Sequence, residues 1–189
     1  MITKFNEFVI LDTEFTAWEG SQYRNWSKPD EFREIVQISA IKIKNLDIVK
    51  SINIYITPTR NPLLSKYFTQ LTGITNEYIQ KHGIEFDEAM EQLYEFCGVS
   101  TPIYSYGNDW DVIEENLYLN KITAPKFVNW KPDWHDVCHF FMRYGINTKR
   151  YTSGTIYKIT NKQYTPSVHN AIWDSLSIFI AIKYLLGVL

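Results

Sequence analysis

An apolar segment that runs directly into two acidic residues constrains the fold of this chain more than any other feature. Residues Phe8 to Leu11 read FVIL, a composition typical of a buried strand, and Asp12 and Glu14 follow at once. Because strand side chains alternate, the two acids leave the same face of the strand. Burying charge without a partner is costly. This strand end is therefore either a salt-bridged pair of acids or one half of a metal site.

The spacing of apolar residues along the rest of the chain predicts a mixed α/β fold. Three strands come first, the second and third as a hairpin, and strands then alternate with helices. The expected strands cover 4–12, 34–43, 48–56, 101–107 and 126–130. The expected helices cover 64–71, 76–81, 86–96, 109–120, 133–145 and 167–186, with one or two helical turns at 152–160. This order predicts a five-stranded mixed sheet with helices on both faces.

Length and composition narrow the class of protein. The 189 residues fit a single domain covering 1–189, and a net charge of −2 provides no overall basic field for duplex binding. The negative net charge does not exclude a nucleic-acid enzyme whose acidic site binds divalent cations, because the ions reverse the local sign of the charge. The two cysteines form neither a CxxC pair nor a disulfide framework, and no signal peptide precedes Asp12, so we expect a cytoplasmic protein. The apolar segment 178–189 contains Lys183 and is too short to span a bilayer, so we expect a core helix and no membrane partner.

Further acidic residues and one histidine occur far from the first strand. Asp109 and Asp111 lie where the fourth strand gives way to a helix, and His169 precedes Asp174 by five residues near the last helix. Five helical positions leave two side chains roughly 140° apart, so His169 is expected at the helix entrance and Asp174 on its body. Taken alone, HNAIWD is simply a helix start with one polar contact. A purely structural cluster of four acids without cations would be strongly unfavourable.

Three segments, LDTEFT, SYGNDWD and HNAIWD, resemble in order the three motifs of the DEDDh (DnaQ-like) 3′→5′ exonucleases. YFTQLTGIT resembles the segment between the first two motifs of that family, and TSGTIYKIT resembles the segment before the last. Each motif is weak singly, but five in order from Phe8 to Leu185 make a strong signal. The Trp-rich loop after the first motif and the NDWD form are most similar to the Eri-type exoribonucleases. Ribonuclease T and oligoribonuclease are more distant.

The resemblance implies a ribonuclease-H-like fold and a two-metal mechanism. Carried over by position, Asp12, Glu14 and Asp174 would ligate one Mg²⁺ or Mn²⁺, and Asp12 would bridge to a second ion. Asp111 would assist through water, and His169 would be the general base. Carboxylate oxygens suit such hard cations, and paired ions clamp the attacking and leaving oxygens of a displacement. An imidazole with a pKa near ~6.5 is suited to accept a proton at neutral pH.

The resemblance also implies residues that contact the substrate. Thr16 would contact the sugar of the 3′-terminal nucleotide, Phe15 would flank its base, and Leu71 would form a wedge against that base. For Phe15 and Leu71, plain core packing is the alternative interpretation.

The middle motif offers two aspartates, Asp109 and Asp111. In the family that the chain resembles, the motif aspartate follows an aromatic residue and precedes a helix whose apolar residues come three to four positions later. The resemblance therefore favours Asp111, which follows Trp110. Asp109 is then interpreted as the cap of that helix.

These observations predict a metal-dependent 3′→5′ exonuclease that releases 5′-mononucleotides from single-stranded RNA or DNA, with RNA weakly favoured. One alternative is an oligoribonuclease that acts on very short RNAs. Another is a non-catalytic nucleic-acid-binding domain of the same fold. The sequence leaves the oligomeric state open, a homodimer included.

Overall fold

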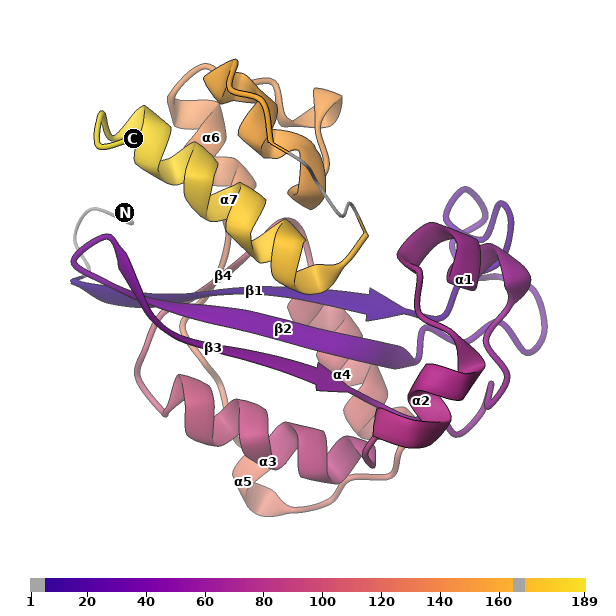
Figure 1. Ribbon diagram of the computed structural model, residues 1–189. Coiled ribbons are helices and arrows are strands. Elements are labelled where there is room, and N and C mark those ends of the chain that lie inside the picture. Colours follow the sequence, from indigo (N-terminus) through magenta and orange to yellow (C-terminus); the bar gives the residue numbers. More distant parts are fainter. Residues whose placement is uncertain (1–5, 165–168) are drawn as a thin grey trace.

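A mixed five-stranded sheet organises the chain, which the computed structural model describes over residues 6–164 and 169–189 (Figure 1). The strand order is β3-β2-β1-β4-β5. Strand β1 pairs antiparallel with β2, which pairs antiparallel with β3, whereas β1–β4 and β4–β5 are parallel. The strands are β1 (Glu7–Phe15), β2 (Ile35–Lys44), β3 (Asp47–Tyr55), β4 (Ile103–Ser105) and β5 (Trp134–Asp136). The predicted mixed sheet of five strands is confirmed.

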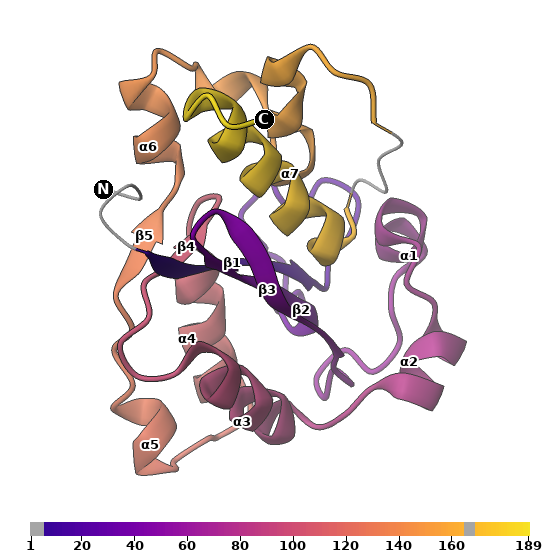
Figure 2. The same ribbon diagram turned by 60° about the vertical axis from the view of Figure 1, so that its left-hand side comes forward.

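Helices cover both faces of this sheet, as Figures 1 and 2 show. One face carries α3 (Phe86–Cys97) and α4 (Asp109–Leu119), and the other carries α6 (Cys138–Arg143) and α7 (Ala171–Leu185). Two short helices, α1 (Lys66–Thr72) and α2 (Asn76–His82), lie beyond the carboxyl end of β1. The remaining helical segments are α5 (Pro125–Val128) and the 3₁₀ helices η2 (Thr148–Arg150) and η3 (Ser153–Thr160).

Strand β1 lies at the centre of the sheet and contributes to both hydrophobic cores. Val9 and Leu11 belong to the core beneath α3 and α4, whereas Phe8 and Ile10 belong to the core beneath α7. All four side chains are almost completely buried. The even-numbered positions that follow therefore face the α7 side, and these are the positions of the two acids.

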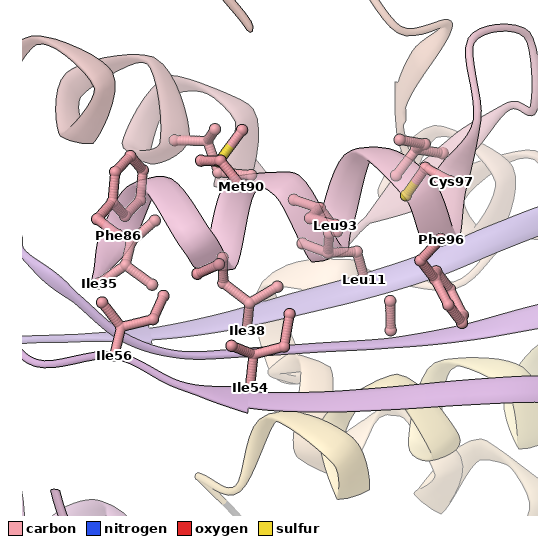
Figure 3. Packing of buried hydrophobic residues seen from close by; sticks show 14 of the residues in the cluster. Leu11, Ile35, Ile38, Ile54, Ile56, Phe86, Met90, Leu93, Phe96 and Cys97 are labelled. Atoms are coloured by element: carbon pink, nitrogen blue, oxygen red, sulfur yellow. The ribbon is translucent and has the colours of Figure 1, made fainter. Parts of the chain in front are cut away.

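The core beneath α3 shows why this helix forms where its periodicity predicts it. Met90 and Leu93 project from α3 toward Leu11 and Ile38 of the sheet (Figure 3). All four side chains are fully buried. Each such side chain contributes about 1.5–3 kcal/mol on burial, so the face of α3 toward the sheet stabilises the scaffold that holds β1 in place.

The position of the fifth strand was predicted wrongly. Residues 126–130 do not form a strand; α5 (Pro125–Val128) is helical there, with proline at its favoured first position. The fifth strand is Trp134–Asp136, inside the helix predicted at 133–145. Three residues are too few for a visible alternation pattern, and pairing with β4 decides their conformation.

Helix α7 fits the expectation of a core helix. Ile178 and Ile182 are fully buried against the sheet. Within the residues that the structure describes, no helix combines the length and the apolar character needed to cross a membrane. The predicted helix began at residue 167, and its first two residues lie outside the described part.

Candidate active site

Four carboxylates and one histidine meet in a cleft of about 380 Å³ at the carboxyl end of β1. Asp12 and Glu14 come from β1, Asp109 from the start of α4, Asp174 from α7, and His169 from the turn before α7. Glu14, His169 and Asp174 each place one potential ligand atom within 4.8 Å of the other two. Residues from three distant parts of the sequence thus form one polar cluster.

Strand β1 holds Asp12 and Glu14 on a rigid support. Asp12 pairs in register with Ser39 of β2, and Glu14 pairs with Gln37. The two acids are only 6% and 9% exposed. Because β1 continues to Phe15 instead of ending at the acids, both carboxylates project from regular, hydrogen-bonded strand and not from a loop.

The structure brings Asp109 into the cluster and leaves Asp111 out, which corrects the assignment made from the sequence. The Oδ1 atom of Asp109 accepts hydrogen bonds from Thr13 N at 3.1 Å and Thr13 Oγ1 at 2.5 Å. Asp111 is exposed and does not line the cleft. Asp109 is in helical phase with buried Ile113, whereas Asp111 points roughly 200° away. Nor is Asp109 the cap, since Asn108 occupies that position.

Helix α7 is tied to the sheet at the point where Asp174 projects from it. The backbone N–H of Ala171 donates to Gln37 Oε1 of β2 at 3.2 Å, whereas Asn170 at the N-cap makes no capping bond. Asp174 is 2% exposed, and its Oδ2 accepts from Ser153 Oγ at 2.9 Å. Sequence reasoning missed both Gln37 and Ser153, because neither bond leaves a local signal.

His169 lies where the helical geometry predicted, in the turn that leads into α7. Its φ of +61° is in the left-handed region, which is uncommon for residues other than glycine. Burial lowers the pKa of the His169 imidazole, because the charged form loses its hydration. The ring is therefore neutral at pH 7 and able to accept a proton.

The four carboxylates disfavour one another's charge. Burial raises the pKa of Asp12 well above its usual range, and the three neighbouring carboxylates raise it further. Burial also raises the pKa of Glu14 well above its usual range, and the charges of Asp174 and Asp109 raise it further. Burial is also the largest cause that raises the pKa of Asp109 to about 6 and that of Asp174 to about 7. Full ionisation of this cluster requires added positive charge.

The protein does not supply that charge within its described residues. None of the ion pairs there involves any of the four acids. The described residues therefore give no support to the alternative of a salt-bridged strand end for Asp12 and Glu14. Among the described residues, the buried Oδ1 of Asp174 finds no hydrogen-bond partner, so this oxygen can act as a ligand. A set of carboxylate oxygens with one unsatisfied buried acceptor fits Mg²⁺ or Mn²⁺.

Two of the three predicted substrate-contacting residues line the cleft. Phe15 lies at its wall and packs against Trp26, with ring centroids 5.4 Å apart. Leu71 reaches the cleft from α1. Neither side chain is fully buried, so both remain available to a ligand.

Thr16 is placed differently. Its side chain is 2% exposed and does not line the cleft. The Thr16 hydroxyl donates to Phe32 O at 2.5 Å and accepts from Glu34 N at 3.0 Å. A hydroxyl used in this way holds the loop that follows β1, and the expected contact between the Thr16 hydroxyl and a sugar is corrected.

Aromatic side chains that the sequence did not single out complete the cleft. Trp26, Tyr67, Tyr106 and Tyr151 all line it. The Tyr106 hydroxyl donates to Thr148 O at 2.7 Å and so fixes the segment around η2 that forms one wall. The sequence signals were the Trp-rich loop after the first motif and the high aromatic content of 16%, and neither tells a cleft from a core.

A family model described as exonuclease (RNase T) matches residues 9–180. The chain therefore belongs to this exonuclease family, and the resemblance to exonucleases predicted from the sequence is confirmed. It is similar to the probable 3′-5′ exonuclease KapD of Bacillus subtilis (strain 168), with 27% identity over 122 residues, 64% of this chain and 57% of that protein. It is also similar to ERI1 exoribonuclease 2 of Xenopus laevis, with 27% identity over 77 residues, 40% of this chain and 10% of that protein. The chain thus spans little more than half of one relative and a small part of the other.

Solved structures with the same fold include the nuclease domain of 3'hExo, described as a DEDDh family member bound to rAMP. It superposes with a TM-score of 0.77 and 19% identity, covering 97% of this chain and 92% of that one. Cell-death related nuclease 4 gives a TM-score of 0.74 and 20% identity, covering 97% and 64%. An Escherichia coli ExoI–ssDNA complex gives 0.68 and 15%, covering 96% and 42%. At this level of identity the similarity establishes the fold, and the ribonuclease-H-like architecture is confirmed.

Proposed function

We propose that residues 1–189 form a single exonuclease domain that hydrolyses phosphodiester bonds in the 3′→5′ direction and releases 5′-mononucleotides. The observation that carries the proposal is the meeting of four buried carboxylates and one histidine in one cleft, with no cationic side chain paired to the carboxylates in the described residues. Membership of the exonuclease family agrees with this chemistry.

Asp12, Glu14, Asp109 and Asp174 would hold two divalent cations, Mg²⁺ or Mn²⁺. When bound, such ions neutralise charge on the phosphate and lower the pKa of water. The chain's own part is to fix the carboxylates on β1, α4 and α7 and to keep them out of bulk water. Asp109 replaces Asp111 in this proposal because it alone of the two lines the cleft.

His169 would be the general base that takes the proton from the attacking water. Its lowered pKa favours the neutral, proton-accepting form at pH 7. Its place in the turn before α7, and not on the helix body, allows the ring to adjust when substrate enters.

The aromatic walls of the cleft favour single-stranded substrates. Aromatic side chains stack on bases without regard to sequence, and Phe15 and Leu71 would flank the terminal base. Among the structural relatives, one complex contains rAMP, one concerns recognition of a histone mRNA stem-loop, and one contains ssDNA. We propose single-stranded RNA or DNA as substrate, with RNA weakly favoured.

We also propose that the protein works in the cytoplasm. Both cysteines are free, as is usual for proteins in a reducing compartment.

The proposal is tested with purified protein and oligonucleotides labelled at the 5′ end, with Mg²⁺, with Mn²⁺ and with chelator. We expect stepwise shortening from the 3′ end that needs the cation and falls at least 100-fold in Asp12→Ala. Shortening that survives chelation or the substitution would contradict the proposal. The rates of hydrolysis of dinucleotides and of long strands test the alternative of an oligoribonuclease. Tight RNA binding without turnover would support the alternative of a non-catalytic nucleic-acid-binding domain.

A further inference from the structure

We propose that Ser153 and Gly154 are positioning residues that set the orientation of the Asp174 carboxylate. Ser153 holds one carboxylate oxygen, and Gly154 provides the space for the other. The inference rests on the proposed function, because it assigns Asp174 to the cation site. The two residues lie 20 or more positions away from Asp174 in the sequence and touch it only in the folded protein.

Ser153 contacts one side of the carboxylate. Its hydroxyl donates to Asp174 Oδ2 at 2.9 Å, and the carboxylate is otherwise buried. Ser153 lines the same cleft as Asp12 and Asp174. A hydroxyl has a single proton to donate, and Asp174 Oδ2 receives it. Oδ2 is thereby held in place, whereas no hydrogen-bond partner of Oδ1 is found among the described residues.

Gly154 contacts the other side. A Cβ atom at this position would overlap Asp174 Oδ1, and it would lie 3.0 Å from Asp174 Cγ and 3.1 Å from Asp174 Oδ2. Side-chain atoms do not approach one another this closely, so any larger residue would push the carboxylate away. The φ angle of Gly154 is not positive, and the backbone itself would accept alanine. Glycine is therefore required by the carboxylate and not by the turn.

The segment that carries both residues is fastened to α7. Trp173 Nε1 donates to Gly154 O at 3.1 Å, and Tyr157 N donates to Ser177 Oγ at 3.2 Å. These bonds join η3 and α7 at two places, on either side of Asp174. A carboxylate held between two joined elements has little freedom to rotate, which is the usual purpose of hydrogen bonds around metal ligands.

A double-mutant cycle tests the role of Gly154 without any metal or substrate. In chelator, Gly154→Ala should lower the melting temperature of the wild type by about 4–8 °C, as expected for overpacking in a protein of this size. In an Asp174→Ala background the same change should lower it by less than about 1 °C, because the clashing atoms are gone. An equal loss in both backgrounds would show that Gly154 serves the turn alone and would overturn this part of the proposal.

Mn²⁺ binding by calorimetry tests Ser153. Ser153→Ala should weaken binding about tenfold, in keeping with the loss of a bond that orients a ligand, and Ser153→Thr should restore most of it. Ser51→Ala, on the exposed strand β3, is the matched control and should bind as the wild type does. Unchanged Mn²⁺ affinity in Ser153→Ala would overturn the assignment. Neither measurement depends on nuclease activity, so failure here is distinguishable from failure of the proposed function.

Discussion

Two aspartates that stand two residues apart on α4 differ in every property that matters for a metal site. Asp109 is 9% exposed and accepts two hydrogen bonds from Thr13, whereas Asp111 is exposed to solvent. The sequence motif NDWD does not distinguish them, but the helical phase does. Asp109 lies four residues before the buried Ile113 and therefore on the same face of α4. The spacing of these two residues could have been used in the sequence to choose Asp109.

Asp109 and Asp111 allow a prediction with a matched control variant. Asp109→Asn should lower kcat at least 100-fold, because it removes a negative charge from the proposed cation site while keeping the shape and the Oδ1 acceptor. Asp111→Asn removes the same charge from the same helix, and we expect less than a twofold change. Single-turnover rates at saturating Mg²⁺ provide the measurement. Comparable losses in both variants would contradict the placement of the site.

At the scale of elements, the start of α7 depends on strand β2 more than on its own residues. The N-cap residue Asn170 makes no capping bond, and its buried Oδ1 has no partner among residues 6–164 and 169–189. Gln37, fully buried on β2, accepts from Ala171 N instead and also donates to Asn53. A side chain from the neighbouring sheet thus performs the capping that a local residue usually provides, and it sets where α7 begins.

We therefore expect stability to respond to Gln37 and not to Asn170. Gln37→Met should reduce the free energy of unfolding by about 1–3 kcal/mol, because it leaves a buried N–H of α7 unpaired. Asn170→Ala should change it by less than about 0.5 kcal/mol, although the usual rule for N-caps predicts a loss of about 1 kcal/mol. Urea unfolding measures the free energy of unfolding of both variants. A larger loss of stability in Asn170→Ala than in Gln37→Met would refute the role given to Gln37.

For the whole molecule, the cluster of acids links stability to pH and to cations. The folded-state pKa values of Asp109 and Asp174, about 6 and about 7, lie above their ordinary value of 3.8. The folded protein therefore binds more protons than the unfolded chain. The stability that this provides is fully present below pH 3.8 and is lost as the pH rises through about 7.

In chelator, the melting temperature of wild-type protein should accordingly fall between pH 5 and pH 8, relative to Asp174→Asn. At pH 8, Asp174→Asn should be more stable than the wild type by about 1–3 kcal/mol, because it removes a charge that lacks compensation. Added Mn²⁺ should raise the melting temperature of the wild type far more at pH 8 than at pH 5. Scanning calorimetry at the two pH values, with Asp111→Asn as control, measures both effects. A cation effect that is independent of pH would argue against the carboxylate cluster as its origin.

Sequence patterns predicted the positions of the first four strands along the chain, the burial of β1 with two acids on one face, and the places of His169 and Asp174 around the start of α7. Each of these follows from periodicity within a few neighbouring residues, which a single strand or helix imposes on its own side chains. The first motif and the last were therefore readable before any fold was known.

The remaining features depend on contacts between elements that are far apart in the sequence. Strand β5 forms because β4 offers it a partner, and Thr16 is unavailable because it binds the loop that leads into β2. Gln37 meets α7 across 134 residues and Ser153 meets Asp174 across 21. Contacts over such distances depend on where whole elements pack, and no local pattern of residues encodes them.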